Sequence, residues 1–195
     1  MDIVAGALVA YLLGSIPTAY LVVRLATGRD IREVGSGNVG ALNVKRATGS
    51  LTLALLTLLT DVAKTFFALW TVERFFPAAL PFAPFFLVLG HNYPVWTGFK
   101  GGRGIAVLLA SALYLDPQFA VTWVLVWAVG YMLSGYIAVG AMAAHILTPI
   151  VEKVLFGEVA APLVLALIPV WMRYLEKAEL LARGQLRKHY WDGER

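Results

Sequence analysis

The sequence predicts an all-α, polytopic integral membrane protein, because of its composition, its apolar runs and its distribution of cations. Hydrophobic residues make up 59% of the chain and charged residues 14%, with a mean hydropathy of +0.74. Soluble domains carry about 25% charged residues. Because 195 residues suit one domain and no linker or repeat is visible, we expect a single transmembrane domain over residues 1–195.

Seven membrane helices are expected, since a bilayer needs about 20 apolar residues and most runs approach that length. Pro17 should kink the first helix, and Ser134-Gly135 should divide a run that is too long for one span. Two helices, 105–115 and 159–172, are short, and the tail from Arg173 onward is polar and helical in character. The expected spans are 3–23, 51–72, 75–99 with an end near Leu89, 105–115, 117–134, 135–151 and 159–172.

The cations predict the orientation, because basic loops stay on the cytoplasmic side. Arg74 and Lys153 are the only cations in the polar turns expected at 73–74 and 152–158. The N-terminus should therefore lie outside and the C-terminus in the cytoplasm. The cations expected on the cytoplasmic face are Arg24, Arg29, Arg32, Lys45, Arg46, Lys100, Arg103, Arg173, Lys177, Arg183, Arg187, Lys188 and Arg195.

The stretch from Gly90 to Ala106, GHNYPVWTGFKGGRGIA, is the strongest candidate for a functional site. Its glycines allow main-chain N–H groups to approach a ligand, and Lys100 and Arg103 add positive charge. A helix expected after Gly104 would offer free N–H groups at its N-terminus. These features indicate a phosphate cradle built around Gly101, Gly102 and Gly104, or otherwise a flexible basic loop.

The stretch from Gly35 to Val44, GSGNVGALNV, is the second candidate. Small hydroxyl and amide side chains lie among glycines, and two cations, Lys45 and Arg46, follow. This pattern suits binding of a phosphate or a polyol, although glycine, serine and asparagine also dominate ordinary turns. The residues concerned are Gly35, Ser36, Gly37, Asn38, Asn43 and Arg46.

Three further polar positions lie near apolar runs. Asp61 and Lys64 are three residues apart on one helix face at mid-membrane depth, where ionisable groups face a polar cavity or each other. His91 is a candidate general base or a structural histidine. Ser134 sits at a helix break and could complete a polar wall. The chain has no cysteine and no visible metal-ligand cluster, so neither a metal nor a cofactor is expected.

These observations leave two classes of function open. A cytoplasmic pocket that binds phosphate could serve an enzyme acting on a lipid precursor. It could equally serve a membrane carrier or binder of an anionic phosphorylated lipid precursor. Composition does not choose between them.

Both motifs closely resemble those of the PlsY family of bacterial acyl-phosphate:glycerol-3-phosphate acyltransferases. The similarity extends to Asp61-Val62-Ala63-Lys64, to Leu133-Ser134-Gly135-Tyr136 and to the order of apolar runs. The resemblance implies a seven-helix enzyme of the bacterial inner membrane whose active site faces the cytoplasm. It implies transfer of a fatty acyl group from acyl phosphate to the 1-hydroxyl of glycerol 3-phosphate, giving lysophosphatidate and phosphate. It also implies transient contact with PlsX, the peripheral enzyme that produces acyl phosphate.

On this resemblance we expect the residues of both motifs to hold two anionic substrates, with no enzyme nucleophile, because acyl phosphate is already activated. The expected catalytic group is Ser36, His91, Lys100, Arg103 and Ser134. The expected substrate-binding group is Gly35, Gly37, Asn38, Asn43, Arg46, Gly101, Gly102, Gly104, Tyr174 and Lys177.

The chain departs from the family pattern at three of these positions. Arg103 stands where the family usually has lysine, and the guanidinium is larger and planar. In the third motif, Tyr174 replaces histidine and Lys177 replaces asparagine, while Arg173, Glu176 and Gly184 are retained. Lys177 cannot accept a hydrogen bond from a glycerol hydroxyl. These exchanges predict an altered acceptor or a weakened activity.

Overall fold

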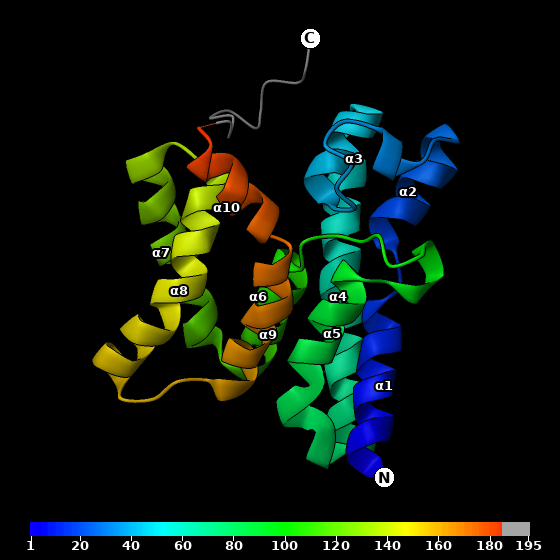
Figure 1. Cartoon of the computed structure of the whole chain (residues 1–195). Coiled ribbons are helices and arrows are strands. Elements are labelled where there is room, and N and C mark those ends of the chain that lie inside the picture. The colour runs from blue at the N-terminus through cyan, green and yellow to red at the C-terminus, as the bar shows by residue number, and fades with distance from the viewer. Residues whose placement is uncertain (185–195) are drawn as a thin grey trace.

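The computed structural model describes residues 1–184, except for the side chain of Glu176, and contains helices and no strand in that range. The helices stand side by side, with the N-terminus at the lower end in Figure 1 and the connections on either side of α3 and between α7 and α8 at the upper end. In chain order they are α1 (Asp2–Gly14), α2 (Thr18–Thr27), η1 (Ile31–Glu33), α3 (Ala41–Thr48), α4 (Leu51–Phe75), η2 (Pro77–Phe82), α5 (Ala83–Asn92), η3 (Val95–Thr97), α6 (Ile105–Leu115), α7 (Pro117–Ser134), α8 (Ile137–Phe156), α9 (Ala161–Met172) and α10 (Leu175–Ala182).

Four helical segments are long and apolar enough to cross a membrane: Asp2–Thr27, Leu51–Phe75, Pro117–Ser134 and Ile137–Phe156. The predicted short apolar helices are present as α6 and α9. The predicted break after Ser134 is also confirmed, since Gly135 adopts a left-handed φ of 75° between α7 and α8. The polar tail forms α10 as far as Ala182, and the remaining tail cations from Arg187 onward lie outside the described residues.

The first predicted span is present as the segment Asp2–Thr27, and the kink predicted at Pro17 takes the form of an interruption between α1 and α2, because proline has no N–H. The bounds of other elements differ from the prediction. The third span begins as the 3-10 helix η2, which contains Pro77 and Pro81, and α5 continues past Leu89 to Asn92. The polar turns expected at 73–74 and 152–158 are largely helical, because α4 and α8 continue to Phe75 and Phe156. Arg74 and Lys153 lie in last helical turns, where the helix dipole favours cations.

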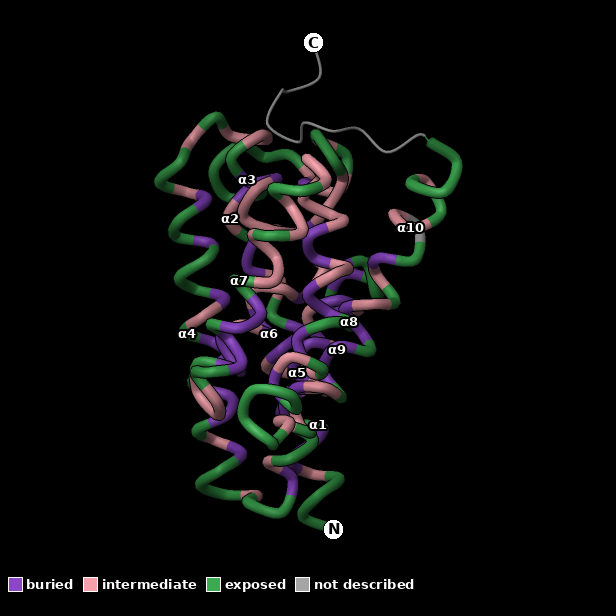
Figure 2. The backbone as a smooth tube through the Cα atoms, turned by 90° about the vertical axis from the view of Figure 1, so that its left-hand side faces the viewer, coloured by how far each residue is buried: buried purple, intermediate pink, exposed green. Residues whose placement is uncertain are grey.

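Helix α5 is the central element, packed between α1 and α9. Its contact with α1 depends on glycine: a Cβ on Gly90 would lie 2.2 Å from the Tyr11 carbonyl oxygen, and one on Gly14 would lie 2.4 Å from the Leu87 carbonyl oxygen. Leu87 and Val88 are fully buried in the core that α5 shares with its neighbours. Figure 2 shows buried segments through the middle of the molecule and exposed segments at its ends.

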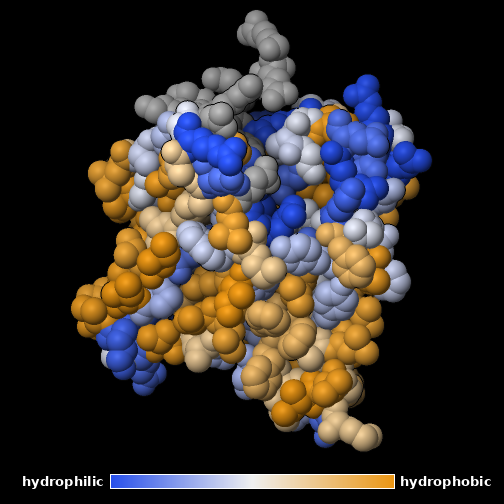
Figure 3. Space-filling view, in the orientation of Figure 1, coloured by the Kyte–Doolittle hydropathy of each residue, from blue (hydrophilic) through white to orange (hydrophobic). Residues whose placement is uncertain are grey.

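The outer surface is apolar over much of its height. In Figure 3 hydrophilic residues gather at the upper end, and hydrophobic residues cover most of the surface below them. Exposure of so large an apolar surface to water would be unfavourable, so this is the kind of surface that a membrane protein presents to lipid. Among the exposed apolar side chains are Leu55, Leu59, Phe67 and Trp70 of α4, Leu125 and Val129 of α7, and Ile146 and Ile150 of α8.

We expect Gly90→Ala to destabilise the protein by about 1–3 kcal/mol, because its methyl group has no room against the α1 backbone. Thermal unfolding in detergent measures the effect. Val121→Ile is the matched control, since it adds one carbon to a side chain that is 58% exposed. Equal unfolding temperatures for the two variants would contradict the close α1–α5 contact.

Candidate active site

The two predicted loops and the start of the tail meet at one end of the helices. A cavity of about 420 Å³ lies between them, lined by Asp30, Arg32, Glu33, Gly37, Val39, Lys100, Gly101 and Arg173. A neighbouring cavity of about 730 Å³ is lined by Tyr20, Arg24, Gly28, Arg29, Asp30, Glu33, Val34 and Gly35. The structure therefore brings Gly35, Gly37, Lys100 and Gly101 of the expected site to adjoining cavities.

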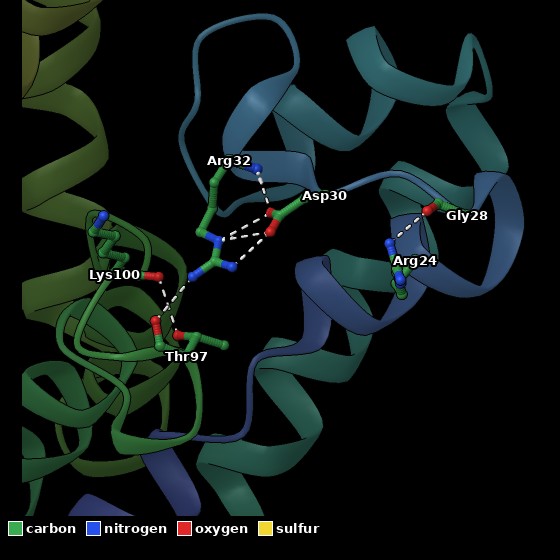
Figure 4. A network of polar contacts seen from close by, with 6 residues as sticks. All are labelled: Arg24, Gly28, Asp30, Arg32, Thr97 and Lys100. Atoms are coloured by element: carbon green, nitrogen blue, oxygen red, sulfur yellow. Dashed lines mark hydrogen bonds and ion pairs between the residues drawn. The ribbon is translucent and has the colours of Figure 1, made fainter.

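Arg32 joins the first loop to the glycine loop (Figure 4). Its Nη1 donates to the carbonyl oxygen of Thr97 at 2.9 Å, and its Nε donates to Asp30 Oδ1 at 2.9 Å. Its hydrogen bond and its charge hold the pKa of the Asp30 carboxyl below its usual value. Thr97 Oγ1 in turn donates to the Lys100 carbonyl oxygen at 3.1 Å. The Arg32 guanidinium, which shapes the cavity wall, is thus held in place by the Asp30 carboxylate.

Asn43 shapes the first loop from within. Its Nδ2 donates to the carbonyl oxygens of Ile31 and Val34 at 3.1 and 2.9 Å, and its Oδ1 accepts from the Ser36 N–H at 2.9 Å. The residue is 1% exposed. Because all of these bonds are internal, Asn43 holds the loop in shape, and its expected contact with a substrate stays a prediction. Its amide leaves the exposed Ser36 side chain at the surface.

The glycine loop uses its N–H groups internally. Gly101 N–H donates to the Asn92 carbonyl oxygen at 3.2 Å, and Gly102 N–H donates to the His91 carbonyl oxygen at 3.0 Å. These two groups are not available to a phosphate, contrary to the expected cradle. Gly104 adopts a left-handed φ of 83° at the N-cap of α6, packed against Asn92.

Arg173 clamps the glycine loop from the start of the tail. Its Nε donates to the Gly102 carbonyl oxygen at 3.1 Å and its Nη2 to the Gly101 carbonyl oxygen at 3.3 Å. By contrast, Lys100 Nζ makes no ion pair or hydrogen bond with the described residues, and Figure 4 shows it pointing away from Thr97. Lys100 is therefore the cavity cation that can receive an anion without breaking another contact.

A buried polar network lies directly beneath the loop. Lys64 Nζ is 2.7 Å from Asp61 Oδ1 and donates to the Ile16 carbonyl oxygen at 2.9 Å. Asp61 Oδ1 also accepts from Thr18 Oγ1 at 2.6 Å. Lys64 and Asp61 are 8% and 2% exposed. The predicted ion pair is thus confirmed, and it faces other polar groups of the protein, with one partner supplied by the helix interruption at Pro17.

His91 connects this network to the glycine loop. Its Nδ1 lies 3.3 Å from Lys64 Nζ. Since an ammonium can only donate, we assign the ring proton to Nε2. A Cβ on Gly102 would lie 2.2 Å from His91 Nε2 and 2.6 Å from the Val39 carbonyl oxygen. Position 102 therefore requires glycine, because the His91 ring and the backbones of both loops meet there. His91 packs against this junction and has a structural role in it.

Two positions that depart from the family pattern contact each other. The Arg103 guanidinium carbon lies 5.7 Å from the centre of the Tyr174 ring, which is within cation–π range. The Tyr174 ring packs in turn against His145. Tyr174 is 2% exposed and supports the Arg103 guanidinium, and its expected contact with a substrate stays a prediction.

Ser134, Lys177, Arg46 and Asn38 are not among the residues that line the 420 Å³ cavity, although Asn38 stands between the lining residues Gly37 and Val39. Ser134 Oγ donates to the Gly130 carbonyl oxygen at 2.7 Å and accepts from the Tyr136 N–H at 3.1 Å. Both bonds tie it to the turn between α7 and α8. Lys177 is on α10 and does not line the cavity. Arg46 packs its aliphatic part near Gly35, and Asn38 Oδ1 is buried without a partner among the described residues.

Four charged cavity residues were missing from the sequence-based site: Asp30, Arg32, Glu33 and Arg173. The spacing Asp-x-Arg at 30–32 is a short-range signal for a side-chain pair, but surface pairs of this kind are common. Arg173 was recognised only as a retained motif residue. Its contact with Gly101 and Gly102 joins positions that are about 70 residues apart, which no local pattern reveals.

The glycerol-3-phosphate acyltransferase family matches residues 4–184. A glycerol-3-phosphate acyltransferase of Agrobacterium fabrum is 39% identical over 185 residues, covering 91% of this chain and 87% of that protein. One of Rhizobium johnstonii is 39% identical over 170 residues, covering 86% and 82%.

Two solved structures are also similar. The crystal structure of PlsY, an integral membrane glycerol 3-phosphate acyltransferase, in its glycerol 3-phosphate form has a TM-score of 0.81 and 32% identity, covering 97% of this chain and 96% of that chain. Its lysophosphatidic acid form has a TM-score of 0.78 and 30% identity, covering 96% and 95%.

We expect the buried pair of Asp61 and Lys64 to show strong coupling in a double-mutant cycle. Loss of one partner of a buried pair costs about 3–5 kcal/mol, because the other charge is left uncompensated. Asp61→Asn with Lys64→Met should therefore destabilise by at least about 1 kcal/mol less than the sum of the single variants, as measured by thermal unfolding. The control cycle is Glu179→Gln with Arg183→Met, an exposed pair whose coupling should stay below about 0.5 kcal/mol. Equal coupling in both cycles would contradict the buried network.

Proposed function

The chain belongs to the glycerol-3-phosphate acyltransferase family, and from this premise we propose its reaction and its site. It transfers a fatty acyl group from acyl phosphate to the 1-hydroxyl of glycerol 3-phosphate, which yields lysophosphatidate and inorganic phosphate for phospholipid synthesis. The main support for the site is the Lys100 ammonium, which has no partner among residues 1–184 and lies in a cavity walled by both glycine-rich loops. Acyl phosphate has a good leaving group, so the protein must position two anions and stabilise developing charge, without a nucleophile of its own.

We assign charge neutralisation on the departing phosphate to Lys100, with Arg103 beside it on its Tyr174 support. Ser36, Asn38 and Arg46 of the first loop bind phosphate oxygens, and Gly35 and Gly37 let the substrate approach the backbone. His91, Asn43, Gly101, Gly102 and Gly104 hold the two loops in register. Ser134 and Lys177, which do not line the cavity, remain proposals for the wall of the acyl-chain or glycerol site.

We also propose how the protein sits in the membrane. The short helices α6 and α9 and the η2–α5 segment complete seven spans, with the four long apolar segments supplying the others. The loop end, with its concentration of cations, faces the cytoplasm of a bacterial cell across the inner membrane, and the N-terminus lies outside. Residues 1–195 act as one transmembrane domain. Acyl phosphate reaches the cavity from the membrane or from PlsX at the cytoplasmic face.

Lys100→Met should lower kcat/KM more than tenfold, because a charged hydrogen bond to phosphate contributes about 1.5–3 kcal/mol. Ser36→Ala should also cost more than tenfold. Lysophosphatidate formed from acyl phosphate and glycerol 3-phosphate is measured with purified protein. Lys153→Met is the matched control, because that lysine lies on α8 and donates to the Gly157 carbonyl oxygen; its activity should be unchanged.

Unchanged activity of folded Lys100→Met would move the site elsewhere. If the unmodified protein formed no lysophosphatidate, an assay with other polyol phosphates would test for a different acceptor. Exchange of labelled glycerol 3-phosphate into liposomes without an acyl donor would instead support a membrane carrier.

Arg103 and Tyr174 should act as a coupled pair in catalysis. A cation–π contact contributes about 0.5–2 kcal/mol, so Arg103→Lys and Tyr174→His should be non-additive in kcat/KM by at least about twofold. The double variant restores the residue types that the family usually has at both positions. As the control, Arg24→Lys combined with Tyr174→His should be additive, because Arg24 donates to the Gly28 carbonyl oxygen. Additivity in both cycles would show that the two departures are independent.

A further inference from the structure

The end of the molecule opposite the loops contains an acidic cavity that the proposed reaction does not use. It has a volume of about 530 Å³ and is lined by Asp116, Gln118, Glu152, Phe156, Glu158, Val159 and Ala160. These residues come from the α6–α7 corner, the end of α8 and the α8–α9 connection. Figure 3 shows a hydrophilic patch at the lower left, where Figure 1 places the α8–α9 connection, beside an otherwise apolar surface.

Glu152 is the buried acceptor of this cavity. It is 2% exposed, and its Oε2 accepts from Gln118 Nε2 at 3.3 Å. Its Oε1 is buried without a hydrogen-bond partner among the described residues. Burial of a carboxylate without a cation or a full set of donors is costly. Glu152 therefore lines the cavity with a carboxylate whose Oε1 has hydrogen-bonding capacity that the described residues do not use.

The carboxylates of this cavity have no cationic partner within residues 1–184. None of Asp116, Glu152 and Glu158 forms an ion pair with a described residue. Lys153, which follows Glu152 in sequence, donates to the Gly157 carbonyl oxygen instead. Asp116 caps the N-terminus of α7, where its Oδ1 accepts from the Phe119 N–H at 3.3 Å, so the carboxylates without a compensating contact of this kind are those of Glu152 and Glu158. The cavity is thus electrostatically suited to a cation from outside the chain.

The polar character continues inward along one face of α8. Thr148, one turn before Glu152, is fully buried and its Oγ1 has no partner among the described residues. Buried Thr57 and Thr65 of α4 instead donate to the carbonyl oxygens four residues earlier. Thr148 Oγ1 is therefore a second buried polar atom with an unused acceptor, one helical turn from Glu152 and behind the residues that line the cavity. An ammonium group has three donors and needs several acceptors of this kind.

An apolar groove adjoins the acidic cavity. Its volume is about 310 Å³, and it is lined by Leu80, Pro81, Leu115, Asp116, Ala160, Pro162 and Leu163. Asp116 and Ala160 line both spaces. A ligand that fills both spaces must combine a cationic head with an apolar tail.

We propose that this acidic cavity binds the primary ammonium head group of a membrane aminophospholipid, with part of its acyl chain along the adjoining groove. The contiguous groove favours a lipid over a free polyamine. A chelated metal ion is disfavoured, because residues 1–184 hold no group of three or more His, Cys, Asp or Glu side chains arranged to bind one. The site is independent of the acyl transfer reaction, so its failure would leave that proposal intact.

Native mass spectrometry of the full chain, with phosphatidylethanolamine, phosphatidylcholine and phosphatidylglycerol of identical acyl chains, tests the proposal. We expect phosphatidylethanolamine to be retained at least fivefold more than the other two lipids. The quaternary ammonium of phosphatidylcholine cannot donate hydrogen bonds, and phosphatidylglycerol has no ammonium group. Glu152→Gln should reduce that retention about tenfold. Asp2→Asn, which removes a carboxylate near the N-terminus at the same end of the molecule, should leave it unchanged.

Equal retention of the three lipids, or unchanged retention in Glu152→Gln, would overturn the proposal. Spermidine that displaces phosphatidylethanolamine at equal concentration would overturn the choice of a lipid. Glu158→Gln is the second variant if Glu152→Gln does not fold, since Glu158 is exposed on the α8–α9 connection. It should lower phosphatidylethanolamine retention at least twofold, and no change would again count against the site.

Discussion

The arrangement of the site depends on the contacts that the Lys64 ammonium makes. A charge at membrane depth must be compensated, and Lys64 meets the Asp61 carboxylate, the Ile16 carbonyl oxygen and His91 Nδ1 together. These groups come from α4, the α1–α2 interruption and α5. A single cation thus fixes where three helices meet, and through His91 it also fixes the junction of the two loops at Gly102.

Above this network, the three cations of the 420 Å³ cavity are used differently: two hold the loops, and the Lys100 side chain has no partner among the described residues. Arg32 and Arg173 use their planar donors on Asp30 and on loop carbonyl oxygens, a geometry that suits arginine. Lys100 carries its charge on a flexible stem at the cavity wall. This division explains how a loop rich in glycine keeps one shape while leaving a positive charge for an anionic substrate.

The exchanges at Arg103 and Tyr174 have a common physical explanation. A guanidinium stacks on an aromatic ring better than an ammonium does, and the tyrosine ring is itself held by His145. The two departures from the family pattern are therefore adjacent in space, although the motifs are separated by about 70 residues. The opposite end of the molecule has a cavity lined by acidic side chains and, next to it, an apolar groove. The two ends therefore differ in the sign of the charge that lines their cavities.

The sequence alone determined the all-helical class, the long apolar segments, the break at Ser134 and the two loops, because periodicity, hydropathy and glycine content are local properties. It also located the Asp61–Lys64 pair, which is one helical turn apart. Only the tertiary structure decided that Asn43 and the N–H groups of Gly101 and Gly102 are used internally. It alone placed Arg173 on the glycine loop and Glu152 in a second cavity, since hydrogen-bond partners from distant segments are set by packing.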